Sequence, residues 1–97
     1  MKIKTSELIG AALDHVVLQL DGDNPSCGFY STDWADGGPI IEREKINLWT
    51  EGYDWEATQY GKWQEWGPTP LIAAMRCYVA SKLGDEVDVP EMCLDDK

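Results

Sequence analysis

The side chains that most often carry out catalysis are few in this chain of 97 residues, and they are widely spaced. His15 is the only histidine. It lies within a helical pattern, which indicates a packed or half-exposed residue more than a general base or a metal ligand. A Ser–His–acid set would require Ser31 and Asp33 to meet His15 from a different element. Ser31 to Asp33 is more typical of a helix or turn cap, so we expect no enzymatic activity.

Carboxylates are concentrated in one segment, where they could gather around a divalent cation as hard oxygen ligands. They are Asp33, Asp36, Glu42 and Glu44. Arg43 and Lys45 alternate with the last two, and the spacing matches no metal-binding loop, so a solvated face is the favoured interpretation. The run Gly37-Gly38-Pro39 is too short for a phosphate loop, lacks the Lys and the Ser or Thr that follow in one, and is interpreted as a turn. No metal and no other cofactor are expected.

The cysteines indicate a reducing compartment. Cys27, Cys77 and Cys93 are an odd number without CxxC spacing, whereas a secreted domain of this size is expected to carry an even set of disulfides. Free thiols are therefore the favoured interpretation. The N-terminal residues lack the apolar stretch of a secretory signal, and no apolar run approaches the ~20 residues of a membrane span. We expect a cytoplasmic protein without membrane association.

The charge of the chain limits its partners. It carries 18 acidic and 8 basic residues, a net charge of −10. Direct binding to nucleic acid is disfavoured, because Lys and Arg must neutralise the phosphates, and anionic membrane surfaces are disfavoured for the same reason. A strongly negative surface favours capture of a basic partner and can speed association ~10–10³-fold at low salt. Solubility alone is the other interpretation of this charge.

Aromatic residues are crowded into the middle of the chain. All five tryptophans fall between Trp34 and Trp66, and nine of the ten aromatic residues fall between Phe29 and Trp66. Each such ring can bury ~150–250 Å², which is more than a simple connection between helices needs. We therefore expect this segment to form part of the core, a binding surface, or both.

Two long helices are expected to frame the aromatic segment. Apolar residues recur every three to four positions over residues 6–20, after the candidate N-caps Thr5 and Ser6. Gly10 interrupts this pattern and weakens a helix interior by about 1 kcal/mol relative to Ala. The second helix, residues 69–83, is the clearer of the two.

The second helix has a complete set of end signals. Thr69 is the expected N-cap, Pro70 suits the first helical position, and Gly84 suits the C-cap. A further short helix is expected over residues 39–45, opened by Pro39. Residues 86–89 alternate as a short edge strand, and the acidic segment 85–97 is expected to fray at its end.

Residues 46–66 indicate a three-stranded antiparallel meander with two-residue turns at Glu51-Gly52 and Gly61-Lys62. With turns this tight, period-two alternation fixes two faces. The apolar face, expected to pack on the long helices, carries Ile46, Leu48, Tyr53, Trp55, Ala57 and Trp66. The other face mixes rings with carboxylates and carries Asn47, Trp49, Asp54, Glu56, Thr58, Tyr60, Trp63 and Glu65.

The mixed face gives the sharpest functional hypothesis. Trp49, Tyr60 and Trp63, together with Glu56 and Glu65, would form a partner-binding surface, because Trp and Tyr dominate interface hot spots. In the alternative interpretation residues 34–45 fold over this face, and its rings belong to the core.

Arg76 is a further candidate for the binding surface. It is the only cation between Lys62 and Lys82. Its guanidinium could pair with a carboxylate of the sheet such as Glu56, or it could anchor the helix through backbone carbonyls. An exposed Arg76 would instead bind an anion of the partner.

Three blocks of the sequence resemble a family of phage proteins. YSTDWADGGPIIEREKI (residues 30–46), GPTPLIAAMRCYVASKLGDEVDVP (residues 67–90) and the opening MKIKTSELIGAALD are similar to the NinX-like small proteins of tailed bacteriophages. The resemblance implies a phage origin and the αβα layering of a broader group of phage domains. It implies no activity and carries over no catalytic residue, since the function of this family is unknown.

We predict a single α+β domain over residues 1–97, a small αβα sandwich in which a short antiparallel meander packs against two main helices and a short helix. The predicted function is that of a phage accessory protein that binds another protein. Its partner would be a basic, nucleic-acid-handling protein of the host or of anti-phage defence, which the acidic chain inhibits or modulates. The alternative is a small-molecule or nucleotide-binding module in which Arg76 and the tryptophans form a pocket.

Overall fold

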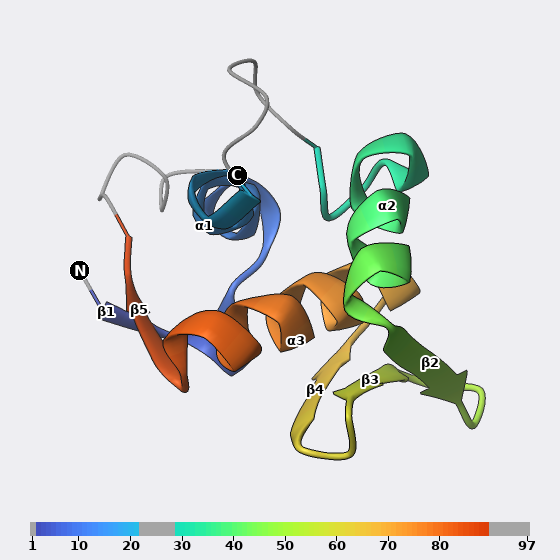
Figure 1. The fold of residues 1–97 in the computed structure, drawn as a ribbon. Coiled ribbons are helices and arrows are strands. Elements are labelled where there is room, and N and C mark those ends of the chain that lie inside the picture. The colour runs from blue at the N-terminus through green and yellow to red at the C-terminus, as the bar shows by residue number, and fades with distance from the viewer. Residues whose placement is uncertain (1, 22–28, 90–97) are drawn as a thin grey trace.

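The longest helix, α3 (Pro70–Leu83), crosses the middle of the molecule, and the other elements are arranged around it (Figure 1). The structure is a computed structural model that describes residues 2–21 and 29–89. The other elements, in chain order, are β1 (Lys2–Lys4), the 3-10 helix η1 (Thr5–Glu7), α1 (Gly10–Asp21), α2 (Trp34–Glu44), β2 (Ile46–Thr50), β3 (Trp55–Gln59), β4 (Trp63–Gly67) and β5 (Glu86–Asp88).

Helix α3 forms where the sequence predicts it and ends at the predicted caps. The hydroxyl of Thr69 accepts a hydrogen bond from the backbone N–H of Ile72 at 3.1 Å, and Pro70 lies in the first turn. Gly84 follows the last turn at φ 89°, a backbone conformation that favours glycine. Nine of the 14 residues of α3 are buried, because the helix has neighbours on nearly every side.

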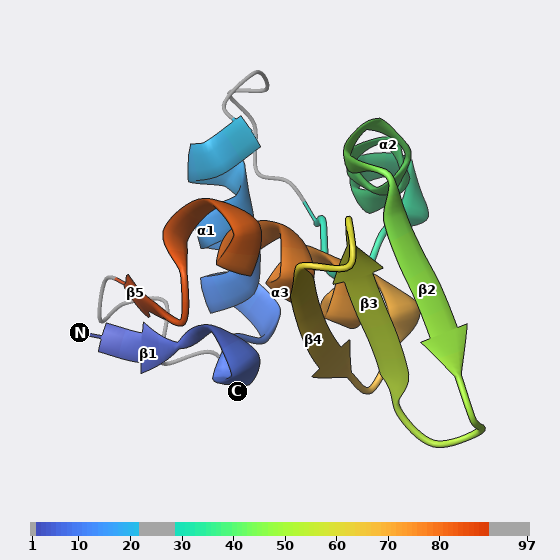
Figure 2. The ribbon, with the colours of Figure 1, turned by 60° about the horizontal axis from the view of Figure 1, so that its bottom comes forward.

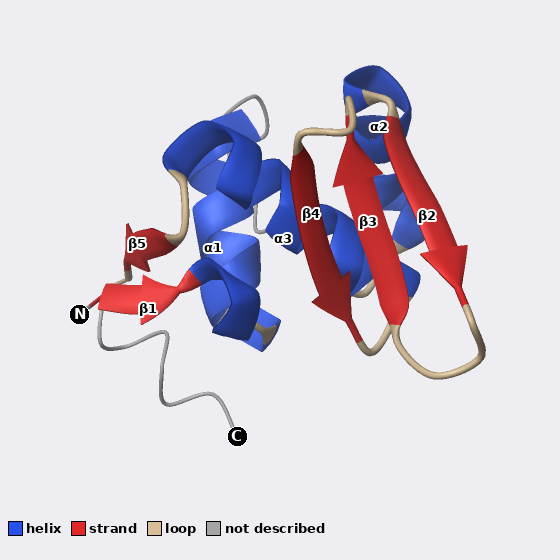
Figure 3. Cartoon of the chain, turned by 90° about the horizontal axis from the view of Figure 1, so that it is seen from below, coloured by secondary structure: helices blue, strands red, loops and turns tan. Residues whose placement is uncertain are grey.

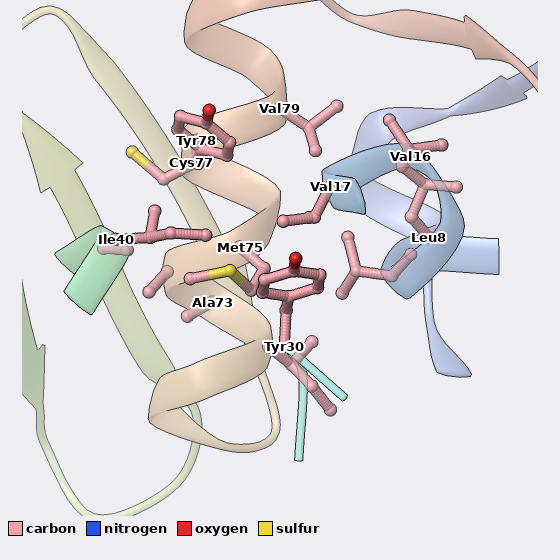
Figure 4. Close-up of a cluster of buried hydrophobic side chains, with 14 of the residues drawn as sticks. Leu8, Val16, Val17, Tyr30, Ile40, Ala73, Met75, Cys77, Tyr78 and Val79 are labelled. Carbon is pink, nitrogen blue, oxygen red and sulfur yellow. The ribbon is translucent and has the colours of Figure 1, made fainter. Parts of the chain in front are cut away.

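The core has three layers in the order α1, α3, three-stranded sheet, and α2 lies beside them in contact with α3 and β2. Figure 4 shows Met75 of α3 beside Tyr30, on the side where Val17 of α1 lies, whereas Cys77 points to the opposite side, toward the strands. Figure 2 and Figure 3 show the described helices together on one side of the sheet. The predicted α+β class, with an antiparallel meander packed against helices, is confirmed.

Helix α1 begins at Gly10 and not at residue 6, so the N-cap role predicted for Thr5 or Ser6 is wrong. Gly10 has φ 61°, and this left-handed conformation turns the chain from η1 into the helix. Thr5 is fully buried. Its backbone N–H donates to the carbonyl of Asp85 at 2.7 Å, and its hydroxyl donates to the carbonyl of Gly84 at 2.6 Å. These bonds join the first residues to the end of α3.

Helix α2 begins at Trp34 and not at the predicted Pro39, so the turn predicted for Gly37-Gly38-Pro39 is wrong. Asp33 is the N-cap, because its carboxylate accepts a hydrogen bond from the backbone N–H of Ala35 at 2.9 Å. The cap predicted for residues 31–33 is therefore confirmed. The helix continues through Pro39, so neither the glycine pair nor the proline ends it.

The two glycines of α2 differ in their surroundings. A Cβ on Gly37 would collide with the backbone oxygen of Tyr30 and would lie 2.7 Å from Cδ2 of Leu71. A Cβ on Gly38 would meet only a ring carbon of Trp34, at 3.9 Å. Gly37 therefore allows the close approach of α2 to its neighbours, a packing reason that the apolar pattern does not reveal.

The three-stranded sheet is antiparallel in the order β2–β3–β4, with Leu48 opposite Ala57 and Ala57 opposite Glu65. Its loops are longer than the predicted two-residue turns, since residues 51–54 join β2 to β3 and residues 60–62 join β3 to β4. In the second loop Tyr60 has φ 56° and Gly61 has φ 65°, so the positive-φ pair lies one residue earlier than predicted.

The longer second loop reverses the predicted orientation of β4. A shift of one residue moves every side chain of a strand to the other face. Trp63 and Glu65 therefore lie on the inner face, toward α3, while Trp66 lies on the outer face. Tyr53 and Asp54 belong to the first loop and to neither face. The predicted faces of β2 and β3 are otherwise confirmed.

A second, two-stranded sheet joins β1 to β5, with Lys2 opposite Asp88 and Lys4 opposite Glu86. The strand predicted for residues 86–89 is confirmed over Glu86–Asp88, whereas its partner β1 was not predicted. The expected fraying of the acidic segment concerns residues 90–97, which lie outside the described residues, as do Cys27 and Cys93. Among the described residues, no helix has the length and the apolar character needed to cross a bilayer.

Candidate functional site

One face of the three-stranded sheet is covered by no described helix, and we call it the open face (Figure 3). Alternation along the strands places six side chains on it, in two rows that run across the sheet. One row holds Asn47, Thr58 and Gln64, and the other holds Trp49, Glu56 and Trp66. The second row sets a carboxylate between two indole rings. Trp49 and Trp66 are 57% and 51% exposed, so the open face presents aromatic surface to solvent.

The loop at residues 51–54 extends the aromatic row. A depression of about 200 Å³ forms here, and we call it the aromatic depression. It is lined by Trp49, Glu51, Tyr53, Asp54, Glu56 and Trp66. Thr50 holds the loop in place, because its hydroxyl donates to the carbonyl of Asp54 at 2.9 Å and accepts from the N–H of Gly52 at 3.0 Å.

The aromatic depression carries three carboxylates, of which Asp54 is close enough to Arg76 for their charges to interact. Its carboxylates, Glu51, Asp54 and Glu56, form no ion pair with any cation in residues 2–21 and 29–89. The carboxylate of Glu56 accepts a hydrogen bond from the side-chain amide of Gln64, its neighbour on β4. The depression therefore combines a held carboxylate, two exposed indoles and two further carboxylates.

The predicted binding residues separate into different places in the structure. Trp49 and Glu56 both lie on the open face, as predicted, and the observed register makes them direct cross-strand neighbours. Tyr60 is exposed, but it lies in the loop at the other end of β3, away from the aromatic depression. The interpretation in which residues 34–45 cover the open face is wrong, because α2 packs against α3 and the β2 side of the molecule.

Trp63 and Glu65 are not part of the open face, which corrects the prediction for both. Trp63 packs against the core, and its carbonyl accepts a weak hydrogen bond from the thiol of Cys77 at 3.7 Å. Lys62 lies over the Trp63 ring, with its ammonium 5.6 Å from the ring centroid. The three-residue loop before β4 is the physical reason for both corrections.

Arg76 anchors α3 through backbone carbonyls, one of the three roles considered for it. Its Nε donates to the carbonyl of Leu8 at 2.8 Å, and its Nη1 donates to the carbonyl of Trp66 at 2.8 Å. The ion pair predicted with Glu56 is wrong, since Glu56 points to the open face. Burial lowers the pKa of Arg76, and the charges of Glu65 and Asp54 partly offset this effect.

Glu65 lies between two hollows on the inner side of β4. It lines a small cavity of about 160 Å³ together with Arg76. It also lines a groove of about 730 Å³, together with Lys2 and Lys4 of β1 and with Asp85 and Glu86. Burial raises the pKa of Glu65, the charge of Arg76 opposes the increase, and Asp85 adds to it.

The segment that was considered for a metal site has other contacts. The carboxylate of Asp36 accepts the backbone N–H of Phe29 at 2.9 Å, and Glu44 pairs with Arg43 at 3.0 Å. Burial raises the pKa of Glu44, but the hydrogen bonds from Arg43 and Gln59 outweigh it, so the pKa lies below its ordinary value. No group of His, Cys, Asp or Glu among the described residues could hold a metal ion.

Two side chains that could act as nucleophiles, Cys77 and Ser31, are buried. Burial, with the nearby charge of Glu65, raises the pKa of Cys77 to about 12, so its thiol stays protonated at neutral pH. The hydroxyl of Ser31 is buried and finds no hydrogen-bond partner among the described residues. The carboxylate of Asp14 accepts the backbone N–H of Ser31 at 2.8 Å, whereas an activated nucleophile needs a base bound to the hydroxyl itself.

Sequence reasoning missed four members of the aromatic depression: Glu51, Tyr53, Asp54 and Trp66. Three of them belong to a loop that was assigned to a turn or a strand. Trp66 was placed on the wrong face because Tyr-Gly is not a usual positive-φ pair, whereas Asn-Gly or Asp-Gly would have signalled the turn. The faces of β2 and β3 do not depend on the loop at residues 60–62, so Trp49 and Glu56 were placed on the correct face.

Comparison with protein families identifies the family of this chain. No curated protein matches the chain. The family model described as "Bacteriophage P22, NinX" matches residues 24–82. This range covers more than half of the chain and contains α2, the three-stranded sheet and nearly all of α3, the elements that build the open face. The chain therefore belongs to the phage P22 NinX family.

Proposed function

We propose that this phage protein acts by binding another protein, a basic one, through the open face of its sheet. The observation that carries the proposal is the row Trp49–Glu56–Trp66, in which two exposed indoles flank a carboxylate. Trp is the residue type most enriched at interface hot spots, because it buries a large area with few rotatable bonds. A phage protein that leaves two tryptophans half exposed on one flat face offers a surface for association.

Charge favours a basic partner. Glu51, Asp54 and Glu56 gather at the aromatic end of the open face, and the whole chain has a net charge of −10. A second copy of the chain fits poorly, because stacking two open faces would bring like charges together. A positively charged protein surface would be attracted from a distance and oriented toward the face.

The partner class that fits best is a nucleic-acid-handling protein of the bacterial host or of its anti-phage defence. Such proteins carry the clustered Lys and Arg that bind phosphates. An acidic surface that occupies those residues would compete with the nucleic acid, so the phage protein would inhibit or modulate its partner in the cytoplasm of the infected cell.

The nucleotide-binding alternative finds less support in the geometry. Arg76 and Trp66 do line a common cavity, but its volume is about 160 Å³, and Asp54 and Glu65 line it as well. Two carboxylates would repel a phosphate, and the guanidinium already binds two backbone carbonyls. A thermal-shift screen with nucleotides tests this alternative, because a ligand that binds the folded state raises the melting temperature.

Affinity capture from infected cells tests the proposal. The bait is the wild-type chain, and quantitative mass spectrometry compares it with the double variant Trp49→Ala/Trp66→Ala and with Trp34→Ala. Trp34 is a matched control, since it is 53% exposed at the start of α2. We expect a basic protein that the wild type and Trp34→Ala capture equally, that the double variant loses, and that elutes with added salt.

Two results would contradict the proposal. One is a partner that the double variant, shown by its unfolding curve to be folded, retains in full. The other is a complex that added salt does not weaken, since the electrostatic contribution of the basic partner would then be absent.

A further inference from the structure

The aromatic depression is large enough to bind one side chain of another protein. Its volume of about 200 Å³ lies below the ~300–1,000 Å³ of pockets that enclose drug-sized ligands. It opens on the surface between β2, β4 and the loop at residues 51–54, so a group carried by another protein can reach it. A whole nucleotide or cofactor would extend far beyond it.

The chemistry of the aromatic depression selects a cation. Trp49 and Trp66 are the direct cross-strand neighbours of Glu56, and side chains paired in this way have Cβ atoms about 4.5–5.5 Å apart. The amide of Gln64 holds one oxygen of Glu56, and among the described residues the other oxygen accepts no hydrogen bond. A cation placed here would meet a carboxylate and the electron-rich faces of indoles at the same time.

The walls of the aromatic depression are held before any partner arrives. Glu56 and the two tryptophans stand on paired strands of the sheet. Glu51, Tyr53 and Asp54 stand on the loop that the hydroxyl of Thr50 ties at two points. A preorganised site loses less binding free energy, because its own side chains are already ordered.

We propose that the aromatic depression binds the guanidinium of an arginine side chain presented by the protein partner. The inference rests on the proposed function and adds the group that the partner inserts. Arginine fits better than lysine, because a planar guanidinium can stack on an indole while its in-plane N–H groups bind the carboxylate of Glu56. A compact, strongly hydrated ammonium can satisfy only one of these contacts well.

The test uses peptides and the full chain. The probes are acetylated and amidated pentaglycines whose central residue is arginine, lysine or citrulline, the uncharged analogue of arginine. Nuclear magnetic resonance follows the indole N–H signals of the tryptophans, which are assigned by substitution. We expect the arginine peptide to shift the signals of Trp49 and Trp66 with saturation, to bind about ten-fold more tightly than the citrulline peptide, and to bind more tightly than the lysine peptide.

Matched variants separate the contacts. Glu56→Gln should weaken binding of the arginine peptide by about three- to ten-fold, and Trp49→Ala or Trp66→Ala by about two- to five-fold each. Glu42→Gln and Trp34→Ala change an exposed carboxylate and an exposed indole on α2, and they should leave binding unchanged. Signal dispersion in the same spectra shows that each variant is folded.

Three outcomes would overturn the proposed arginine site. The first is equal binding of the arginine and citrulline peptides, and the second is binding of the lysine peptide that equals or exceeds that of the arginine peptide. The third is a set of shifts that appears equally at Trp34. Failure of the arginine site is distinct from failure of the proposed function. A partner whose capture requires Trp49 and Trp66 but not Glu56 would refute the arginine site and would still support binding through the open face. Saturable arginine binding without a captured partner would refute the proposed function alone.

Discussion

Arg76 shows how a single charged side chain can be structural on a protein proposed to bind by charge. Its two hydrogen bonds reach the carbonyls of Leu8 and Trp66, so it ties the segment before α1 and the end of β4 to α3. Charge-assisted hydrogen bonds of this kind contribute more than neutral ones. Because the guanidinium is committed to these carbonyls, the negative charge of the open face stays available to a partner.

Glu65 is a partly buried carboxylate whose ionisation opposes folding. Burial raises its pKa, so the folded chain binds this proton more readily than the unfolded chain does. The contribution to stability is fully present below the ordinary carboxyl pKa of about 4.3 and is lost as pH rises through the higher folded value. We expect Glu65→Gln to unfold at a higher temperature than the wild type at pH 7, with a difference that shrinks as pH falls through the folded pKa.

Thermal unfolding followed by circular dichroism between pH 3 and pH 7 checks this expectation (a span of about four units around the ordinary pKa). Glu42→Gln, an exposed substitution on α2, controls for the change in net charge. A Glu65→Gln variant that is less stable than the wild type at pH 7 would show that attraction to Arg76 outweighs the cost of burial.

At this scale the sequence predicted two of the six residues that line the aromatic depression, Trp49 and Glu56. Trp49 and Glu56 were placed on the correct face because the loop at residues 51–54 is two residues longer than predicted, and an even change of length keeps the faces of both strands. Trp63 and Trp66 were exchanged between faces because their orientation depends on the length of one loop. The loop length depends on the positive φ of Tyr60. Because tyrosine rarely adopts positive φ, the sequence does not indicate a turn at this residue.

At the scale of elements, capping residues predicted the ends of helices correctly, whereas glycines within a helical pattern were misleading. Thr69, Pro70 and Gly84 fixed both ends of α3 through local hydrogen bonding and backbone preference. The predicted starts of α1 and α2 were wrong, because each helix contains a glycine that serves a bend of the chain or the packing of the helix, which the neighbouring residues do not indicate. Gly10 makes a left-handed bend before α1, and Gly37 makes room for Tyr30 and Leu71.

The two glycines of α2 provide a matched pair of substitutions. Gly37→Ala should destabilise the fold by about 1–3 kcal/mol, since its Cβ would overlap the backbone of Tyr30 and the neighbouring Leu71. Gly38→Ala should stabilise it by about 0.5–1 kcal/mol, because its Cβ meets no atom closer than 3.9 Å and alanine favours a helix.

Urea unfolding at equilibrium measures both effects. Each glycine is the control of the other, because the chemical change and the helix are the same. Equal effects of the two substitutions would mean that the close approach at Gly37 does not limit the packing of α2.

At the scale of the whole molecule, excess negative charge should weaken the fold while it attracts a partner. The described residues form few ion pairs, chiefly Arg43 with Asp21 at 2.8 Å and with Glu44 at 3.0 Å. The remaining carboxylates repel one another, and salt screens this repulsion. We expect the melting temperature to rise by about 2–6 °C between low and high NaCl concentration.

Thermal unfolding at several NaCl concentrations checks this expectation, with Arg43→Gln as the control. The variant lacks the ion pairs that salt weakens, so its melting temperature should rise more steeply than that of the wild type. A melting temperature that falls with salt would show that the pairs around Arg43 outweigh the repulsion. The expected rise also means that salt can release a partner without unfolding the protein.

The ribbon of β1 and β5 has a consequence for how the molecule is made. Lys2 pairs with Asp88, and Lys4 pairs with Glu86. On the ribosome, residues 2–4 emerge long before residues 86–88, so the nascent chain must hold its first strand without a partner while α1, the sheet and α3 are synthesised and begin to fold. The ribbon therefore closes only after residues 86–88 have left the exit tunnel, when α1, the three-stranded sheet and α3 have already emerged.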